Sequence, residues 1–457
     1  MSATQKVHLI AIGGSAMHNM ALALHETGYR ITGSDDEINE PSKSRLAKAG
    51  LLPAEIGWFP EKLTNDLDAV ILGMHARADN PELLRAKELG LKIYSYPEYI
   101  YQATKDKTRI VIGGSHGKTT ITSMILHVMK HCNIETDFMV GAQLEGFNTM
   151  VRFSNTAKFA VIEGDEYLAS PIDRRPKFHL YHPNIAIISG IAWDHINVFP
   201  TFDMYVDQFR QFIGLIEENG HLIYCQEDKI LKDLCEEKNK NNISKTPYGI
   251  PKNLIENGIT SLVVGDKKIP LEIFGDHNLM NLNGARLVCE KIGITSEQFY
   301  ESMRTFKGAA KRLELVFKNQ HFNFYKDFAH SPSKLKATTS AVKEQFKGRK
   351  LIACMELHTF SSLTEEFLNE YKGAMNTADT AIVYFNPHTI EHKKLKAITI
   401  DQVKQAFDRK DLMVFTKSSD VTDFLKSQNW EDKVLLMMSS GNFDGVDFKA
   451  LANELKM

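Results

Sequence analysis

The sequence has few cysteines, no excess of charge of either sign and no long apolar run, and each absence excludes a class of protein. Its 457 residues include five scattered cysteines, an odd number without metal-ligand spacing, so we expect a reduced cytoplasmic protein and no disulfide framework. Lys and Arg number 55 against 57 Asp and Glu, which favours neither nucleic acid nor a membrane as a partner. No apolar run reaches the roughly 18 residues of a membrane span, and no signal peptide precedes the first strand.

The length of the chain predicts more than one hydrophobic core. At about 150 residues per domain, 457 residues should divide into roughly three domains. Apolar runs alternate with amphipathic segments, which predicts an α/β fold in each. We place the limits at 1–104 for a Rossmann-like domain, 105–309 for a central P-loop ATPase-like domain, and 310–457 for a second Rossmann-like domain.

The central domain contains a candidate phosphate cradle. The apolar segment ending at Ile112 runs into a glycine-rich turn, then Lys118 and Thr119, and then a helix whose apolar positions share one face. Glycines let backbone N–H groups crowd a phosphate, the helix start adds partial positive charge, and a lysine and a threonine hydroxyl serve phosphate and Mg²⁺. Ile112 stands where a strict Walker pattern has glycine, so an ordinary turn at a helix start is the alternative.

Two further strands of this domain are predicted to end in polar residues. The segment 159–162 ends in Glu163, and the segment 185–191 is followed by Asp194 and His195. Parallel strands present their carboxyl ends at one edge of a sheet, where ligands bind. An acid delivered there beside a phosphate cradle suits Mg²⁺, whereas each residue taken singly is more often a loop cap.

The first domain begins with a degraded dinucleotide fingerprint. A strand at 7–12 breaks at Gly13 and Gly14, and Asp35 follows about 20 residues later, as in a nucleotide-binding βαβ unit. Ala11 and Ala16 replace two of the three fingerprint glycines, which disfavours NAD and leaves another nucleotide diphosphate open. Arg77, after the third strand, is read equally as a ligand contact and as a solvated loop cation.

The third domain is predicted as a second doubly wound sheet. Its strands are expected at 322–328, 351–355, 380–385, 412–415 and 434–438. Before it, the segments 261–264 and 271–274 are predicted to form a hairpin, and a helix is expected over 279–292. Polar residues cluster at three of the strand ends, 327–330, 356–362 and 439–443.

Several motifs occur together in one order and resemble the Mur ligases of bacterial cell-wall synthesis over nearly the whole chain. The cradle at 114–120 looks like the family's G-T-H-G-K-T-T, which also lacks the outer Walker glycine. The remaining matches are E-x-D-E-Y at 163–167, D-H at 194–195, G-x-H-N-x-x-N at 275–281, R-x-E at 312–314 and D-[FY]-A-H at 327–330.

The resemblance implies ATP and Mg²⁺ as cofactors and assigns roles to residues. Lys118, Glu163 and His195 would be catalytic, and Mg²⁺ would lie at Thr119, Glu163 and His195. The residues implied for ATP are Gly114, Ser115, His116, Gly117, Lys118, Thr119, Thr120, His277, Asn278, Asn281, Arg312, Asp327 and His330. Those implied for the UDP part of a sugar substrate, bound by the first domain, are Gly13, Gly14, Ser15, Ser34, Asp35, His75 and Arg77. The third domain would hold the amine substrate.

Two kinds of family member act on UDP-N-acetylmuramate itself: one adds L-alanine, and the other adds the murein tripeptide L-Ala-γ-D-Glu-meso-diaminopimelate during peptidoglycan recycling. The sequence is more similar to the second, since 173–178 resembles its D-K-R-S-K-F and 438–445 its M-S-N-G-G-F-G-G, while 355–360 departs from the Q-P-H-R-Y of the first. The main prediction is therefore a cytoplasmic, ATP-dependent, ADP-forming ligase that joins UDP-N-acetylmuramate to the tripeptide through an acyl phosphate. Ligation of L-alanine is the alternative.

The sequence also departs from the family pattern. Lys326 and Ser331 stand where close relatives often have Asp and His, which leaves no role for these side chains to carry over. Several members use a carbamylated lysine after the D-H motif, but the segment 199–220 contains no lysine. A regulatory NTPase and a nicotinamide dehydrogenase built on the first domain remain as functions of other classes.

Overall fold

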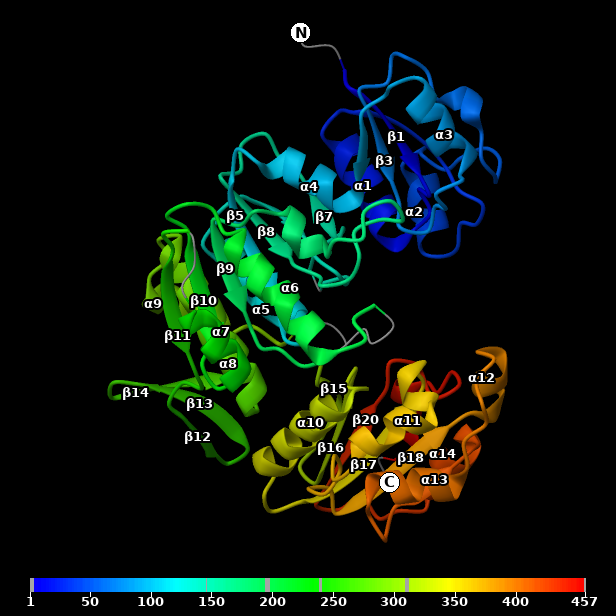
Figure 1. Cartoon of the computed structure of the whole chain (residues 1–457). Helices are drawn as coiled ribbons and strands as arrows, with labels where there is room; N and C mark the ends of the chain where they lie inside the picture. Colours follow the sequence, from blue (N-terminus) through cyan, green and yellow to red (C-terminus); the bar gives the residue numbers. More distant parts are fainter. Residues whose placement is uncertain (1–3, 145, 194–197, 238–240, 309–311, 456–457) are drawn as a thin grey trace. The chain divides into compact units, whose positions relative to one another are not determined.

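The computed structural model describes residues 4–144, 146–193, 198–237, 241–308 and 312–455. The chain divides into two compact units, and Figure 1 labels their helices and strands. Unit 1 comprises residues 1–249 and 280–303, and unit 2 comprises residues 250–279 and 304–457. The boundary passes through helix α8 (Asp276–Lys291). The predicted limits of the three domains are not tested by this division and stay predictions.

Unit 1 begins with a four-stranded parallel sheet in the order β2-β1-β3-β4. Its strands are β1 (Lys6–Ile10), β2 (Arg30–Ser34), β3 (Ala69–Leu72) and β4 (Ile93–Ser95), and its helices are α1 (Ser15–Glu26), α2 (Ser42–Lys48), α3 (Pro81–Glu88) and α4 (Tyr96–Thr104). Asn80 caps α3 by accepting from the N–H groups of Glu82 and Leu83, as a side-chain oxygen before a helix does. The parallel strands carry their connecting turns at one edge, where a ligand crevice forms.

A seven-stranded sheet forms the rest of unit 1, in the order β11-β10-β9-β5-β8-β6-β7. All neighbours pair in parallel except β6 and β7. The strands are β5 (Thr108–Gly113), β6 (Thr136–Met139), β7 (Val151–Arg152), β8 (Phe159–Glu163), β9 (Ile185–Ile188), β10 (His221–Cys225) and β11 (Ser244–Tyr248), and the helices are α5 (Lys118–His131), α6 (Phe202–Gly214), α7 (Lys229–Glu236) and α9 (Ser296–Met303), with part of α8. In β5, Ile110, Val111 and Ile112 are fully buried on both faces, as in a sheet covered by helices on each side.

Unit 2 contains a small antiparallel sheet, β12-β13-β14, and a six-stranded sheet in the order β15-β16-β20-β17-β18-β19. The small sheet consists of β12 (Asn253–Glu256), β13 (Ile259–Val264) and β14 (Lys267–Leu271). The large sheet consists of β15 (Glu314–Lys318), β16 (Phe322–Asp327), β17 (Lys350–Leu357), β18 (Thr380–Phe385), β19 (Met413–Phe415) and β20 (Lys433–Met438). Its helices are α10 (Pro332–Gln345), α11 (Glu365–Leu368), α12 (Pro387–His392), α13 (Ile400–Phe407), α14 (Ser418–Lys426) and α15 (Phe448–Glu454).

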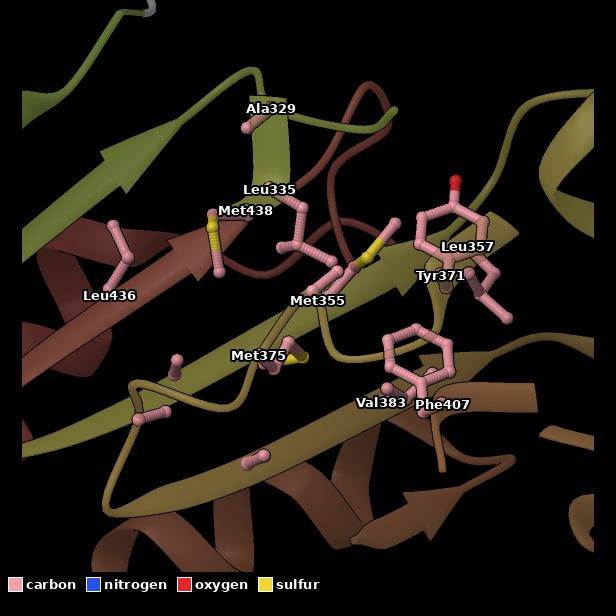
Figure 2. Packing of buried hydrophobic residues seen from close by; sticks show 14 of the residues in the cluster. Ala329, Leu335, Met355, Leu357, Tyr371, Met375, Val383, Phe407, Leu436 and Met438 are labelled. Atoms are coloured by element: carbon pink, nitrogen blue, oxygen red, sulfur yellow. The ribbon is translucent and has the colours of Figure 1, made fainter. Parts of the chain in front are cut away.

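The large sheet of unit 2 has a separate hydrophobic cluster on each face. Met355 and Leu357 of β17 pack with Leu335 of α10 and Phe407 of α13 on one face (Figure 2). On the other face Cys354 joins a cluster with residues of α14 and α15. Because side chains alternate along a strand, each central strand contributes to both layers.

The predicted fold class is confirmed: the chain is mixed α/β with parallel sheets in its successive domains. The five strands predicted for the third domain all form; β18 has the predicted ends, β16, β19 and β20 differ by one residue at one end, and β17 extends further at both ends. The predicted hairpin has a different register, because β14 begins at Lys267 directly after the turn, and β12 and β15 were not predicted. No helix in the described ranges has both the length and the apolar character needed to cross a bilayer.

Truncation of Leu335, which is fully buried in the first cluster of unit 2, tests the packing of that face. Leu335→Ala should lower the free energy of unfolding of unit 2 by about 2–5 kcal/mol, because methyl groups are lost and a cavity remains. Urea denaturation of the full chain, followed by hydrogen exchange in β17 and β20, measures this. Leu315→Ala is the control, because Leu315 of β15 is 46% exposed; an equal loss in both variants would contradict the packing shown.

Candidate active site in unit 1

The turn between β5 and α5 has the backbone geometry of a phosphate cradle. Gly114 and Gly117 have φ angles of +126° and +77°, which residues with a Cβ rarely adopt. A Cβ at Gly114 would also collide with the Ser189 hydroxyl, and one at Gly117 with the Asn281 amide. The glycines therefore permit both the turn and its close contacts, and Asn281, a predicted ATP residue, lies beside the cradle.

The end of β9 supports the cradle from the neighbouring strand. The Ser115 N–H donates to Gly190 O at 3.0 Å, and the Ser115 hydroxyl accepts from the Ala192 N–H at 2.9 Å. The Ser189 hydroxyl donates to His116 O. These bonds join the two adjacent strand ends and fix the shape of the cradle.

Lys118 begins helix α5 and is held in an ion pair. Its Nζ donates to Gly114 O at 2.8 Å and to Glu166 Oε2 at 2.6 Å. Burial alone would lower the pKa of Lys118, but the carboxylates of Glu166, Asp165 and Glu163 outweigh it and raise that pKa above its ordinary value. Lys118 is therefore a fixed positive charge at the cradle.

Thr119 and Glu163 lie together at the edge of the sheet, as predicted. The Thr119 hydroxyl donates to Glu163 Oε1 at 2.9 Å, and the Gly141 N–H donates to Glu163 Oε2 at 3.0 Å. Burial raises the pKa of Glu163, although these donors and Lys118 lower it. A buried carboxylate beside a threonine hydroxyl is an oxygen donor set that fits Mg²⁺.

The predicted third metal residue, His195, and its neighbour Asp194 lie outside the described residues. Within the described ranges, no group of three or more His, Cys, Asp or Glu side chains could hold a metal ion. Of the three predicted magnesium ligands, Thr119 and Glu163 are thus the two that the structure describes.

The first sheet brings four of the predicted UDP residues together. Asp35 Oδ2 accepts from the Gly13 N–H at 2.6 Å, and Ser34 O accepts from Ala11 N and Ile12 N at 2.9 and 3.1 Å. Gly14 precedes α1, whose first residue, Ser15, is exposed. Burial raises the pKa of Asp35, against the lowering effect of the Gly13 N–H. The glycine turn and the acid of the second strand therefore form one structure.

His75 and Arg77 are both exposed in the turn after β3. Arg77 pairs with its neighbour Asp79, with Nε 2.9 Å from Oδ1, and its side chain is 84% exposed. The described contacts of Arg77 are those of a solvated loop cation, and its role toward a ligand stays a prediction.

Unit 2 groups three of the other predicted ATP residues around the end of β16. Asp327 accepts from the N–H groups of Leu313 at 2.5 Å and Ala329 at 2.7 Å. Burial raises the pKa of Asp327 above its ordinary value, and the opposing effects of Arg312 and of these donors are smaller. Arg312 lies over the Phe328 ring, 5.2 Å from its centroid, and His330 Nδ1 lies 2.8 Å from Phe328 O. Asp327 therefore fastens the start of β15 to the end of β16, whatever else it binds.

His277 and Asn278 lie in the first turn of α8, which begins at Asp276. The Asn278 amide donates to Phe274 O at 2.9 Å, and Asn278 is buried. The two residues thus belong to unit 2, whereas Asn281 on the same helix belongs to unit 1.

Comparison with known proteins decides the family. Sequence models match the Mur ligase family catalytic domain over 6–108, the Mur ligase middle domain over 112–289 and the Mur ligase glutamate ligase domain over 311–441. The UDP-N-acetylmuramate–L-alanine ligase of Caldicellulosiruptor bescii is 32% identical over 83% of each chain. The chain belongs to the Mur ligase family.

Solved structures share the fold along the whole chain. The UDP-N-acetylmuramate–alanine ligase of Thermotoga maritima has a TM-score of 0.68 at 20% identity, covering 98% of each chain. The murein peptide ligase of Psychrobacter arcticus has a TM-score of 0.64 at 21% identity, covering 99% of each. As a Mur ligase, the protein is an ATP-dependent enzyme that forms an amide bond and releases ADP, which excludes the regulatory NTPase and the dehydrogenase.

The sequence reasoning did not assign roles to four residues of this Mur ligase site. Glu166 pairs with Lys118, Tyr205 contacts Ser115 and Glu166, Ser189 supports the cradle, and Gly141 donates to Glu163. Glu166 lies inside the E-x-D-E-Y motif, so its position was a signal. The sequence gives no sign of a role for Tyr205, because a fully buried aromatic residue on one face of a helix has the pattern of a core residue.

Replacement of Gly117 tests the cradle of the Mur ligase. Gly117→Ala should lower kcat/KM for ATP about 10- to 100-fold, because strain at a positive φ costs about 1–3 kcal/mol and Asn281 must also move. Gly214→Ala is the control, since a Cβ at that position in α6 meets no atom within 4 Å. Steady-state ligation kinetics compare the two, and unchanged kinetics in Gly117→Ala would contradict the assignment of this turn to nucleotide.

Proposed function

We propose that the protein joins the lactyl carboxylate of UDP-N-acetylmuramate to the amine of L-alanine, with ATP converted to ADP and phosphate. The observation that carries the reaction class is the cradle in which Lys118 lies beside the Thr119–Glu163 pair. The choice of acceptor is supported by the names of similar proteins. The relative at 32% identity is named as an L-alanine ligase, and so is the Clostridium beijerinckii relative, which is 29% identical over 96% of this chain. These names favour the alternative over the main prediction from the sequence.

The proposed first step activates the carboxylate, because oxide is too poor a leaving group for direct attack by an amine. A carboxylate oxygen attacks the γ-phosphorus of ATP, the bond to the β-phosphate oxygen breaks, and ADP leaves. The cradle N–H groups and Lys118 stabilise the charge that develops on the phosphoryl oxygens. Thr119 and Glu163, with His195, would hold Mg²⁺, which when bound neutralises phosphate charge.

The proposed second step forms the amide bond. The uncharged amine attacks the acyl carbon, and the tetrahedral intermediate expels phosphate while the amine loses a proton. In this proposal the turn at Gly13 and Asp35 binds the UDP part, His277 and Asn278 contact adenine, Asp327 the ribose, and Arg312 the phosphates. The third domain holds the acceptor, and closure of the domains excludes water from the acyl phosphate.

The tripeptide is the second candidate acceptor, and the edge of the unit 2 sheet supports it. Buried Glu356 at the end of β17 accepts from the Phe443 N–H at 2.8 Å and lies 3.5 Å from His358 Nδ1. The loop 358–362 that follows contains no arginine or lysine. A free amino acid presents a carboxylate next to its reacting amine, whereas a peptide presents a neutral amide there, so a loop without a strong cation favours the peptide.

A competition experiment separates the two acceptors. The protein is incubated with ATP, Mg²⁺, UDP-N-acetylmuramate and equal amounts of L-alanine and tripeptide, and the products are weighed by mass spectrometry. Formation of the alanyl product is the expected result, and formation of the tripeptidyl product alone would overturn L-alanine in favour of the second candidate. Absence of any ATP-dependent product would contradict both.

The cradle and the sugar-nucleotide turn are assigned to different sheets, which predicts that their functions separate. Lys118→Ala should abolish ligation, because the phosphoryl charge loses its fixed cation. The affinity for UDP-N-acetylmuramate, measured by calorimetry, should stay within about threefold because the sites do not share residues. Equal loss of ligation and of sugar-nucleotide binding would show that the sites are not distinct.

A further inference from the structure

Lys118 has fewer free N–H groups for a phosphate than the catalytic role suggests. An ammonium has three donors, and two of them are used by Gly114 O at 2.8 Å and Glu166 Oε2 at 2.6 Å. Among the described residues, one N–H is left to point at a ligand. Glu166 therefore fixes the direction of the lysine as well as its charge.

Glu166 is itself anchored on its second oxygen. Oε1 accepts from the Tyr205 hydroxyl at 3.1 Å, and the same hydroxyl lies 2.8 Å from Ser115 Oγ in the cradle. The Glu166 side chain is 1% exposed and Tyr205 is fully buried. A network thus runs from Lys118 through Glu166 and Tyr205 back to the cradle.

Among the described residues, the charged side chains that act on Lys118, together with the partner of Asp165, nearly balance one another. Lys118 pairs with Glu166, and Asp165 pairs with Lys177 at 2.6 Å. The donors to Glu163 given above are neutral, a hydroxyl and an N–H. The five charged groups therefore leave one net negative charge at Glu163, which attracts a cation and repels a phosphate chain.

We propose that Glu166, anchored by Tyr205, is a positioning residue that neutralises Lys118 and thereby makes nucleotide binding depend on a divalent cation. Free ADP or ATP meets a site without net positive charge, and the cation at Glu163 supplies the attraction. This inference rests on the use of ATP by the family and on the geometry of unit 1. It does not depend on which acceptor the enzyme uses.

Calorimetric titration of the full chain with ADP, at constant ionic strength, with excess Mg²⁺ or with EDTA, tests the proposal. The measured quantity is the ratio of ADP affinity with Mg²⁺ to ADP affinity without it. In Glu166→Gln this ratio should fall at least about tenfold, because ADP alone then meets an unbalanced Lys118 charge. Glu166→Asp, which keeps the carboxylate, should restore most of the ratio.

Two tyrosine variants separate anchoring from general loss of structure. Tyr205→Phe removes the hydroxyl that contacts Glu166 and Ser115 and should shift the ratio in the same direction as Glu166→Gln, by a smaller factor. Tyr248→Phe is the matched control, because the buried Tyr248 hydroxyl has no hydrogen-bond partner among the described residues, and its ratio should be unchanged.

A ratio in Glu166→Gln equal to that of the unaltered protein would overturn the proposal. The same conclusion would follow if Glu166→Asp and Glu166→Gln behaved alike. The titration contains no sugar nucleotide and no amine, so failure of the proposed ligation would leave its result unaffected.

Discussion

The site depends on the balance of charge around one partly buried lysine. Lys118 lies between a backbone carbonyl and the carboxylate of Glu166, and a buried ammonium without such a partner would lose its charge. The pairing raises the pKa of Lys118 in spite of burial. In the proposed reaction it keeps a cation where phosphoryl charge would develop, while Glu163 beside it would provide a carboxylate for a metal cation. The proposed chemistry therefore depends on how two acids and one lysine are placed beside one another.

The parallel sheet brings these groups together from distant parts of the sequence. Strands β5, β8 and β9 are neighbours, and the end of each contributes to the site: the cradle after β5, Glu163 as the last residue of β8 with Glu166 just beyond it, and residues 189–192 after β9. The side chains in the middle of these strands are apolar on both faces of the sheet, and their packing fixes the positions of the strand ends. The fold supplies the geometry, and the turns supply the reactive groups.

The sequence allowed the fold class to be predicted, and it named residues that the structure places side by side, whose roles stay predictions. The period of apolar residues located the main strands, and the glycines of the cradle with Glu163 were recognised because each follows an apolar strand. Gly117 and Asn281 lie together as their family roles suggested. The predictions were wrong about the register of the small sheet and missed β15, because short exposed strands have weak periodicity. Tyr205 could not be assigned, since burial and hydrogen bonding through one hydroxyl leave no trace in the sequence pattern. The acceptor predicted from short loop motifs is not the one for which the sequence relatives are named.

The central claim is that the cradle transfers a phosphoryl group to a carboxylate. Transfer of ¹⁸O tests it directly: UDP-N-acetylmuramate labelled in both lactyl carboxylate oxygens is ligated with ATP, and the inorganic phosphate is analysed by mass spectrometry. An acyl phosphate passes one carboxylate oxygen to phosphorus, so each phosphate released should carry one ¹⁸O. Unlabelled phosphate formed together with ADP, or label found in AMP, would contradict the account.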